Sequence, residues 1–431
     1  MFKRGDFLNS FVIKGDICQC VSKDELKTYK DSYVICDDNI CKGVYSELPQ
    51  EYNALPLYDY SGKLVLPGLV DLHTHAPQYA FCGLGMDKEL LEWLENYAFL
   101  EEAKYSELEY AQKAYEIFCD KLKHSVTTRA CIFATVHKEA TTLLMDKLEH
   151  SGLVSFVGKV NMDRNCPPAL CESSAQQSIT DTKCWINATK DKYQNTYPIL
   201  TPRFTPSCTD ALMSGLSDLQ QQYNVPLQSH LSENPDEIKW VQELCPNTKN
   251  YADAYAQFGL FGKSAKTVMA HCVYCDDDEM DMMKQNGVFV AHCPASNSNI
   301  ASGIAPIRRY LESELKVGLG SDVAGGNTLS LFATIVESIK VSKLYYRLVD
   351  KNAKPLKFSE AFYMATKGGG EFFGKVGSFE CGFEFDAVVI DDSVLPHPQS
   401  LSVPERLERA VYQSADLLGL NAKFVRGKKI I

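Results

Sequence analysis

Short apolar runs alternate with longer stretches of helical periodicity over most of the chain. Eight such runs, rich in Val, Ile, Leu and Ala, lie between Gly68 and about residue 325, and a loop follows each of them. Continuous apolar runs are typical of parallel strands that are buried on both faces, with helices as their connections. The pattern therefore predicts an α/β fold with eight parallel strands. Their last residues are His75, Phe133, Asn161, Arg203, His230, His271, His292 and Asp322.

Two architectures contain strands of this kind, a (β/α)8 TIM barrel and a doubly wound sheet. Most of the predicted strands end on a polar side chain, and a TIM barrel carries its functional side chains at the C-terminal ends of many different strands. A doubly wound sheet concentrates them at one switch point. The segment is also close to the length of about 250 residues that is typical of a TIM barrel. We therefore favour the barrel.

The two ends of the chain follow a different pattern. Short β-like runs at 11–13, 33–35 and 63–66 are separated by turn residues, and a strand pattern returns at 386–390. The C-terminal piece is too short for a core of its own, so we expect it to pair with the N-terminal segment in one small β-sandwich. The predicted domains are residues 1–66 with 377–431 for the sandwich, and residues 67–376 for the catalytic barrel.

Composition and charge exclude several classes of function. Lys and Arg number 44 against 55 Asp and Glu, so the net charge is −11 and the protein would repel a nucleic-acid backbone. The longest apolar runs fall far short of the roughly 20 residues that a membrane span needs. The 16 cysteines are scattered, and Gly5 and Asp6 interrupt any export signal. We expect no nucleic-acid or membrane partner, and a reducing, cytoplasmic location.

A pair of histidines ends the first predicted barrel strand. His73 and His75 are two residues apart, so their rings lie on the same face of that strand. His230 and Asp322 end the fifth and eighth predicted strands and would meet them at the same rim. Three imidazoles and one carboxylate suit zinc or a neighbouring first-row metal and leave one position for water. His271, at the end of the sixth strand, is either a further ligand or a group that positions this water.

Water on such a metal needs a group that moves its protons. Glu233 lies three residues after His230, and a carboxylate can take and return one proton; Asp322 could share this role. The fourth predicted strand ends at Arg203, which cannot readily become the carbamate bridge of a two-metal site. The nearest lysine, Lys159, is expected to be a buried pairing partner. The sequence therefore predicts one metal ion per chain.

The chain resembles the amidohydrolase superfamily, and within it the guanine deaminase family over nearly its whole length. The superfamily features are PGLVDLHTH at 67–75, the strand-end residues His230, His271 and Asp322, and the spacing of Gly377, Gly382 and Asp386. The segments similar to guanine deaminases are 75–81, 90–94, 133–135, 156–160, 201–204, 229–233 and 320–326. The stretch after His292 is more polar than the family pattern, and we expect His292 to lie behind the ligand set.

This resemblance implies zinc-dependent hydrolytic deamination of guanine to xanthine and ammonia by a homodimer with one Zn²⁺ per chain, Fe²⁺ being the alternative metal. It implies metal ligands His73, His75, His230 and Asp322, catalytic residues Glu233, His271 and Asp322, and substrate-binding residues Gln78, Arg203, Phe204, His230 and Glu233. Hydroxide would attack C2 and Glu233 would protonate N3. Gln78 and Arg203 can hydrogen-bond a purine edge, and Phe204 can cover its ring face.

Two other functions stay open. A hydrolase acting on another ring substrate, such as a pterin, a triazine or an adenosine-type compound, would share the metal site, because the motifs define the metal better than the ring. A metal-free scaffold of the same fold that binds partners is the second alternative. Such scaffolds have lost ligands, whereas the four ligand candidates and Glu233 are all present here.

Overall fold

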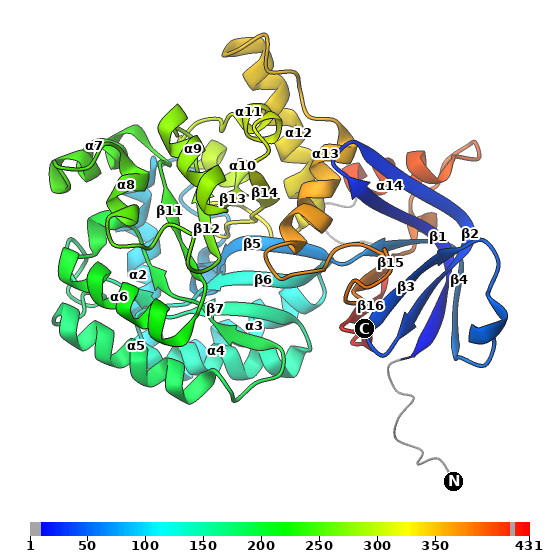
Figure 1. Cartoon of the computed structure of the whole chain (residues 1–431), viewed down its shortest axis with the longest axis horizontal. Coiled ribbons are helices and arrows are strands. Elements are labelled where there is room, and N and C mark those ends of the chain that lie inside the picture. Colours follow the sequence, from blue (N-terminus) through cyan, green and yellow to red (C-terminus); the bar gives the residue numbers. More distant parts are fainter. Residues whose placement is uncertain (1–9, 414–418) are drawn as a thin grey trace.

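A computed structural model describes residues 10–413 and 419–431 of the chain. Figure 1 shows a larger part, in which helices surround a parallel sheet, beside a smaller part built on a second sheet. The larger sheet has the strand order β11-β12-β13-β14-β5-β6-β7-β9, and neighbouring strands are parallel. The predicted α/β class with a parallel sheet is confirmed. These strands are β5 (Leu69–His75), β6 (Thr127–Phe133), β7 (Val154–Gly158), β9 (Thr196–Pro198), β11 (Leu227–Leu231), β12 (Thr267–His271), β13 (Phe289–His292) and β14 (Lys316–Leu319).

The predicted strand ends agree with the structure at most positions. β5, β6, β12 and β13 end where the apolar runs predict, at His75, Phe133, His271 and His292. β11 extends one residue beyond His230, whereas β14 ends at Leu319, so Asp322 lies on the loop after this strand. The φ of Asp322 is 45°, in the left-handed region, which costs a non-glycine residue of order 1 kcal/mol.

The third and fourth predicted strands are each broken in two. β8 (Val160–Asn161) and β10 (Thr201–Pro202) follow β7 and β9 and form a separate parallel pair. The fourth run divides at Ile199 and Leu200, where the backbone N–H of Ile199 donates to Val157 at 3.0 Å and that of Leu200 donates to Pro226 at 2.9 Å. Leu200 also forms a parallel bridge with Leu227 of β11. This segment therefore links the two end strands of the larger sheet.

Helices lie around the outside of the parallel strands (Figure 1). α9 (Asp277–Asn286) shows how local sequence sets their ends: Asp276 and Glu279 form a capping box, and Gly287 ends the helix with a φ of 67°. The other α-helices are α1 (Leu90–Trp93), α2 (Phe99–Ala103), α3 (Leu108–Lys123), α4 (Lys138–Ser151), α5 (Ala175–Thr189), α6 (Asp210–Tyr223), α7 (Pro235–Leu244), α8 (Tyr251–Ala256), α10 (Pro294–Asn299), α11 (Ile307–Glu312), α12 (Leu331–Leu348), α13 (Phe358–Tyr363) and α14 (Val403–Gln413). Two π-helical segments are η3 (Leu94–Ala98) and η6 (Met364–Gly368), and the 3-10 helices are η1 (Gln50–Tyr52), η2 (Ala76–Phe81), η4 (Lys104–Ser106), η5 (Thr205–Ser207) and η7 (Asp392–Val394).

The smaller sheet joins the two ends of the chain. Its strand order is β17-β16-β15-β4-β1-β2-β3, and β15 runs antiparallel to β4 with Val388 opposite Leu66. The predicted pairing of the C-terminal strand with the N-terminal segment is thus confirmed. A separate apolar core that includes Phe11, Phe385 and Phe424 covers one face of this sheet. Its strands are β1 (Phe11–Ser22), β2 (Glu25–Asp37), β3 (Ile40–Tyr45), β4 (Leu57–Pro67), β15 (Ala387–Ile390), β16 (Leu420–Val425) and β17 (Lys428–Lys429).

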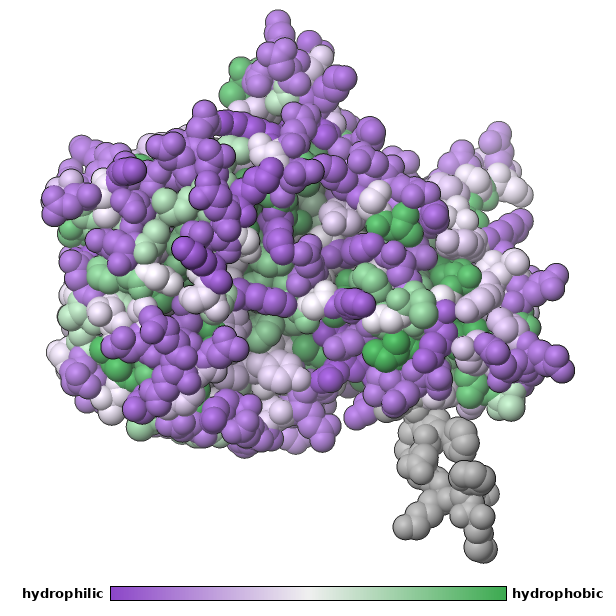
Figure 2. All heavy atoms as spheres, viewed as in Figure 1, coloured by the Kyte–Doolittle hydropathy of each residue, from purple (hydrophilic) through white to green (hydrophobic). Residues whose placement is uncertain are grey.

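The surface is mostly polar on the face that Figure 2 presents, with apolar side chains scattered among hydrophilic ones. Within residues 10–413 and 419–431, no helix has both the length and the apolar character needed to cross a membrane.

A buried ion pair ties the two parts together. Arg129 of β6 donates from Nε to Oδ2 of Asp386 at 2.6 Å and from Nη2 to Oε2 of Glu384 at 2.8 Å. The side chains of Arg129 and Asp386 are 3% and 0% exposed, whereas that of Glu384 is 35% exposed. Asp386 also accepts the backbone N–H of Arg426 at 2.8 Å. One carboxylate thus bonds to the larger part and to the smaller part.

We expect Asp386→Asn to lower the free energy of unfolding by about 2–4 kcal/mol, because the buried guanidinium loses its closest anion. Urea denaturation followed by circular dichroism measures this loss. The matched control is Glu384→Gln, which removes the half-exposed partner and should cost less than about 1 kcal/mol. Equal losses in the two variants would show that burial does not decide the strength of this connection.

Candidate active site

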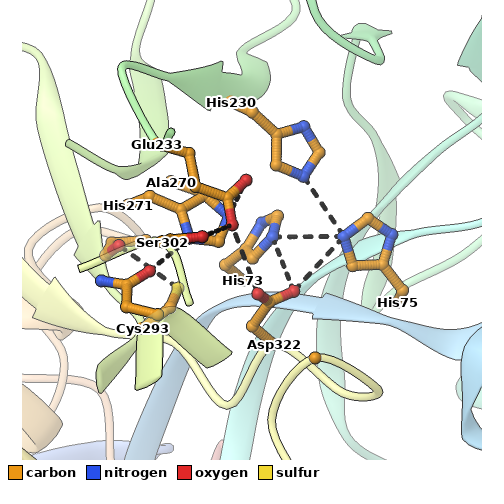
Figure 3. A network of polar contacts seen from close by, with 12 residues as sticks. His73, His75, His230, Glu233, Ala270, His271, Cys293, Ser302 and Asp322 are labelled. Carbon is orange, nitrogen blue, oxygen red and sulfur yellow. Dashed lines mark hydrogen bonds and ion pairs between the residues drawn. The ribbon is translucent and has the colours of Figure 1, made fainter. Parts of the chain in front are cut away.

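Four ligand-type side chains meet at the C-terminal ends of the parallel strands. His73 and His75 come from β5, His230 from β11, and Asp322 from the loop after β14. Figure 3 shows their polar ends pointing toward one another. All four are buried, with exposed fractions of 1%, 3%, 9% and 5% in the same order. The structure therefore brings together the four residues that the sequence predicts as metal ligands.

The distances among these groups suit a cation. Nε2 of His75 lies 3.2 Å from Nε2 of His73 and 3.3 Å from Nε2 of His230. Oδ1 of Asp322 lies 3.1 Å from Nε2 of His73 and 3.5 Å from Nε2 of His75. Four buried atoms with lone pairs thus face one another. Nitrogen and oxygen donors in this arrangement fit a divalent metal ion such as zinc.

His230 is held in the tautomer that a metal ligand requires. Its Nδ1 lies 2.6 Å from the backbone oxygen of Arg203, and because a carbonyl can only accept, Nδ1 carries the proton. The Nε2 atom is then unprotonated and faces His75. Burial lowers the pKa of His75 and of His230 well below the usual value, the charge of His73 adds to this, and burial also lowers the pKa of His73. Neutral imidazole is the form that binds metals.

Asp322 and His271 are stabilised in their charged forms. Burial alone would raise the pKa of Asp322, but the charge and hydrogen bond of His73 and the charge of His271 lower it well below its usual range. Burial alone would lower the pKa of His271, but the charges of Glu233 and Asp322 raise it. Nδ1 of His271 lies 2.8 Å from Oδ1 of Asn297, which orients the ring. Its Nε2 is then 3.4 Å from Glu233 and 3.7 Å from Asp322.

Glu233 is held in place from both sides. Its Oε1 accepts the hydroxyl of Ser302 at 3.0 Å, and its backbone N–H donates to Oε2 of Glu237 at 3.0 Å. Burial raises the pKa of Glu233 to about 7, opposed by His271 and reinforced by the charge of Glu237. A carboxyl group that titrates near neutrality can both accept and release a proton. Sequence reasoning predicts Glu233 and His271 but not the residues that hold them, which are Ser302 and Glu237 for Glu233 and Asn297 for His271.

A pocket opens beside these groups. Phe204 contributes an aromatic ring to its lining, and the polar residues that line it are His75, Gln78, Arg203, His230, Glu233, Glu237, His271, Ser296 and Asp322. The apolar lining comes from Leu90, Trp93, Leu94 and Ile300. Apolar walls with a few directed polar groups are typical of sites for small planar ligands. The structure thus places all five predicted substrate-binding residues, Gln78, Arg203, Phe204, His230 and Glu233, in the lining of this pocket.

A buried carboxylate links two of these predicted substrate-binding residues. Glu102 of α2 accepts a hydrogen bond from Nε2 of Gln78 at 2.8 Å and another from Nη1 of Arg203 at 2.6 Å. Glu102 is 0% exposed. No sequence pattern indicates this role, because two successive glutamates on a helix are typical of a solvated face.

His292 and Cys293 lie behind the site. His292 is fully buried, burial lowers its pKa to about 3, and neither ring nitrogen has a hydrogen-bond partner among the described residues. Cys293 is nearer, since its sulfur lies within 4.8 Å of ligand atoms of His73, His271 and Asp322. The closely spaced ligand atoms are thus those of the predicted residues and of Cys293, in agreement with the expectation that His292 lies behind them.

Comparisons with known proteins agree with this architecture. The family model described as "Amidohydrolase family" matches residues 64–426. The chain therefore belongs to the amidohydrolase family.

The similar proteins include several guanine deaminases. The guanine deaminase of Dictyostelium discoideum is 38% identical over 409 residues, which is 93% of this chain and 88% of that protein. The guanine deaminase of Escherichia coli is 35% identical over 374 residues, 83% of this chain and 82% of that protein. A crystal structure of guanine deaminase from C. acetobutylicum with bound guanine has a TM-score of 0.95 and 45% identity, covering 98% of this chain and all of that one (100%).

We expect Zn²⁺ added to metal-free protein to raise its thermal unfolding temperature by several degrees, because an ion that binds only the folded state stabilises it. Differential scanning calorimetry measures the shift. His230→Asn should reduce it strongly, whereas His124→Asn, which changes an exposed histidine, should leave it intact. The same shift in both variants would show that zinc binds elsewhere.

Proposed function

We propose that this chain catalyses the hydrolytic deamination of guanine to xanthine and ammonia. The observation that carries the proposal is its 45% identity, over 98% of the chain, with a guanine deaminase crystallised with guanine. The geometry supports the same reaction, because a candidate metal centre, a buried carboxyl group and two directed hydrogen-bonding side chains line one pocket. A metal ion can activate water and a carboxyl group can transfer protons in the hydrolysis of an amidine C–N bond, while the hydrogen-bonding side chains can orient the ring.

The metal centre of this proposal is one zinc ion per chain. The residues that would hold it are His73, His75, His230 and Asp322, which supply three neutral nitrogens and one ionised oxygen. Fe²⁺ suits the same donors. A metal ion bound there would supply a Lewis acid and lower the pKa of water.

The protein residues would move the protons. Glu233 would accept a proton from the water that adds to C2 and deliver it to N3 of the purine. The C2–N bond to the exocyclic amine then breaks, and with a second proton the amine leaves as ammonia. His271, oriented by Asn297, would stabilise the negative charge that develops near Glu233 and Asp322. Asp322 could accept the second proton of the added water and pass it to the amine, so that the amine leaves as neutral ammonia.

Substrate binding is assigned to Gln78, Arg203, Phe204, His230 and Glu233. Gln78 and Arg203 have directional hydrogen-bonding groups at one side of the pocket, and Phe204 contributes an aromatic ring to its lining. The contact between His230 and the backbone of Arg203 couples the metal centre to the substrate-binding side.

The architecture around the site is proposed to be a closed (β/α)8 barrel, residues 67–376, with a small β-sandwich made of residues 1–66 and 377–431. The parallel bridge between Leu200 and Leu227 supports closure, since it connects the two end strands. Register shifts between Gly15 and Ile17 support a bend in β1 that would fold the smaller sheet over its own core.

We also propose a homodimer and a cytoplasmic location. Three large apolar side chains on α2 and α3 are exposed, Leu100 by 61%, Leu108 by 50% and Ile117 by 56%, and would suit a contact between two copies. The structure has no disulfide between described cysteines, which is consistent with a reducing compartment.

The first test is to follow guanine in the ultraviolet with the purified protein, beside adenine, cytosine and a pterin, and to count bound metal on the same sample. We expect xanthine and ammonia from guanine alone and about one zinc per chain. Metal without turnover of guanine would favour another ring substrate. Protein without metal or turnover would favour a binding scaffold.

The second test is Glu233→Gln, which we expect to keep the zinc content and lose about 10²–10⁴-fold in kcat, because only the proton carrier is removed. Elemental analysis and steady-state kinetics measure the two quantities. Glu243→Gln, on the exposed side of α7, is the matched control. Loss of zinc in Glu233→Gln would place this carboxylate among the ligands instead.

A further inference from the structure

We infer that Glu102 is a positioning residue that sets the preference of the pocket for purines with a hydrogen-bond acceptor at position 6. The inference rests on the proposed function, since it concerns how Gln78 and Arg203 meet the substrate. It adds a residue that does not line the pocket itself but is bonded to two residues that do.

The contacts of Glu102 use both carboxylate oxygens. Oε1 accepts from Gln78 at 2.8 Å and Oε2 accepts from Arg203 at 2.6 Å, and the residues Glu102, Gln78 and Arg203 are 0%, 2% and 3% exposed. They come from α2, from η2 after β5, and from the residue after β10. One buried anion thus joins three separate segments next to the site.

This anion fixes which way the amide of Gln78 points. An ionised carboxylate can only accept, so the nitrogen of the amide must face Glu102. The other end agrees, because Oε1 of Gln78 accepts the backbone N–H of Ala324 at 3.1 Å. With both ends assigned by their partners, Gln78 cannot exchange its donor and acceptor without losing two hydrogen bonds.

Arg203 is held by the same anion. Its guanidinium lies 5.0 Å from the ring centroid of Phe99 while Nη1 bonds to Glu102. Arginine has five N–H donors and no acceptor, so every hydrogen bond that it offers to a ligand is a donated one. The adjacent O6 and N7 of guanine both accept, which matches a guanidinium, whereas a 6-aminopurine presents donors at position 6.

Glu102→Gln tests the inference. Its amide accepts through one atom and donates through the other, so it cannot serve Gln78 and Arg203 together. We expect kcat/KM for guanine to fall about 10–100-fold, mostly through KM, with zinc content unchanged. 2,6-Diaminopurine keeps the reacting C2 amine but has an amine at position 6. The kcat/KM for 2,6-diaminopurine should fall much less. The ratio of kcat/KM for guanine to kcat/KM for 2,6-diaminopurine should therefore decrease.

The neighbouring glutamate provides a matched control. Glu101 is also buried but bonds to Lys104 and Tyr110, away from the pocket. Glu101→Gln should leave KM and the substrate ratio at their wild-type values. An unchanged ratio in Glu102→Gln, or an equal change in both variants, would overturn the inference.

If the Glu102→Gln variant fails to fold, the inference can still be tested on the wild-type holoenzyme. We expect hypoxanthine, with oxygen at position 6, to bind at least tenfold more tightly than adenine in calorimetric titrations. Equal affinity would overturn the inference. If the wild type bound hypoxanthine selectively but did not deaminate guanine, the proposed reaction would fail while this preference stood.

Discussion

The convergence of four buried lone pairs on one point is the constraint on which the centre of this molecule depends. Three imidazole nitrogens and one carboxylate oxygen face one another at 3.1–3.5 Å. His230 donates its only proton outward, to the backbone of Arg203, so it offers none to His75. Holding these atoms so close together needs rigid supports, and the C-terminal ends of parallel strands in one sheet supply them. The hydrogen bonds of Glu102 and Glu237 hold the neighbouring residues, which are Gln78 and Arg203 for Glu102 and Glu233 for Glu237.

Much of the fold could be predicted because a strand buried on both faces has a simple sequence pattern. The same pattern places the ends of β5, β6, β12 and β13 correctly. It fails where the backbone leaves regular geometry. The fourth run divides into two short strands at Ile199 and Leu200, and Asp322 has a left-handed φ beyond the end of β14. The apolar pattern of the sequence carries no information about these local changes in backbone geometry.

The candidate site was predictable where its residues end strands, because the fold then fixes their direction. His73, His75, His230 and His271 belong to this group. Gln78, Arg203 and Phe204 required a resemblance to a family, since loop residues follow no periodicity. Glu102, on helix α2, escaped both approaches, and so did Glu237 on α7. An acidic residue on a helix is usually solvated, and only tertiary packing reveals that these two carboxylates are buried beside donors.

The pairing of β4 with β15 has a consequence for how the chain folds as it is made. β4 precedes the entire catalytic part and β15 follows it, yet the two are neighbours in one sheet. During synthesis from the N-terminus, β1 to β4 emerge long before their C-terminal partner and expose an unpaired edge. Closing so long a loop is entropically costly unless the intervening residues have already become compact. We therefore expect the smaller sheet to be completed last, after the larger part has folded.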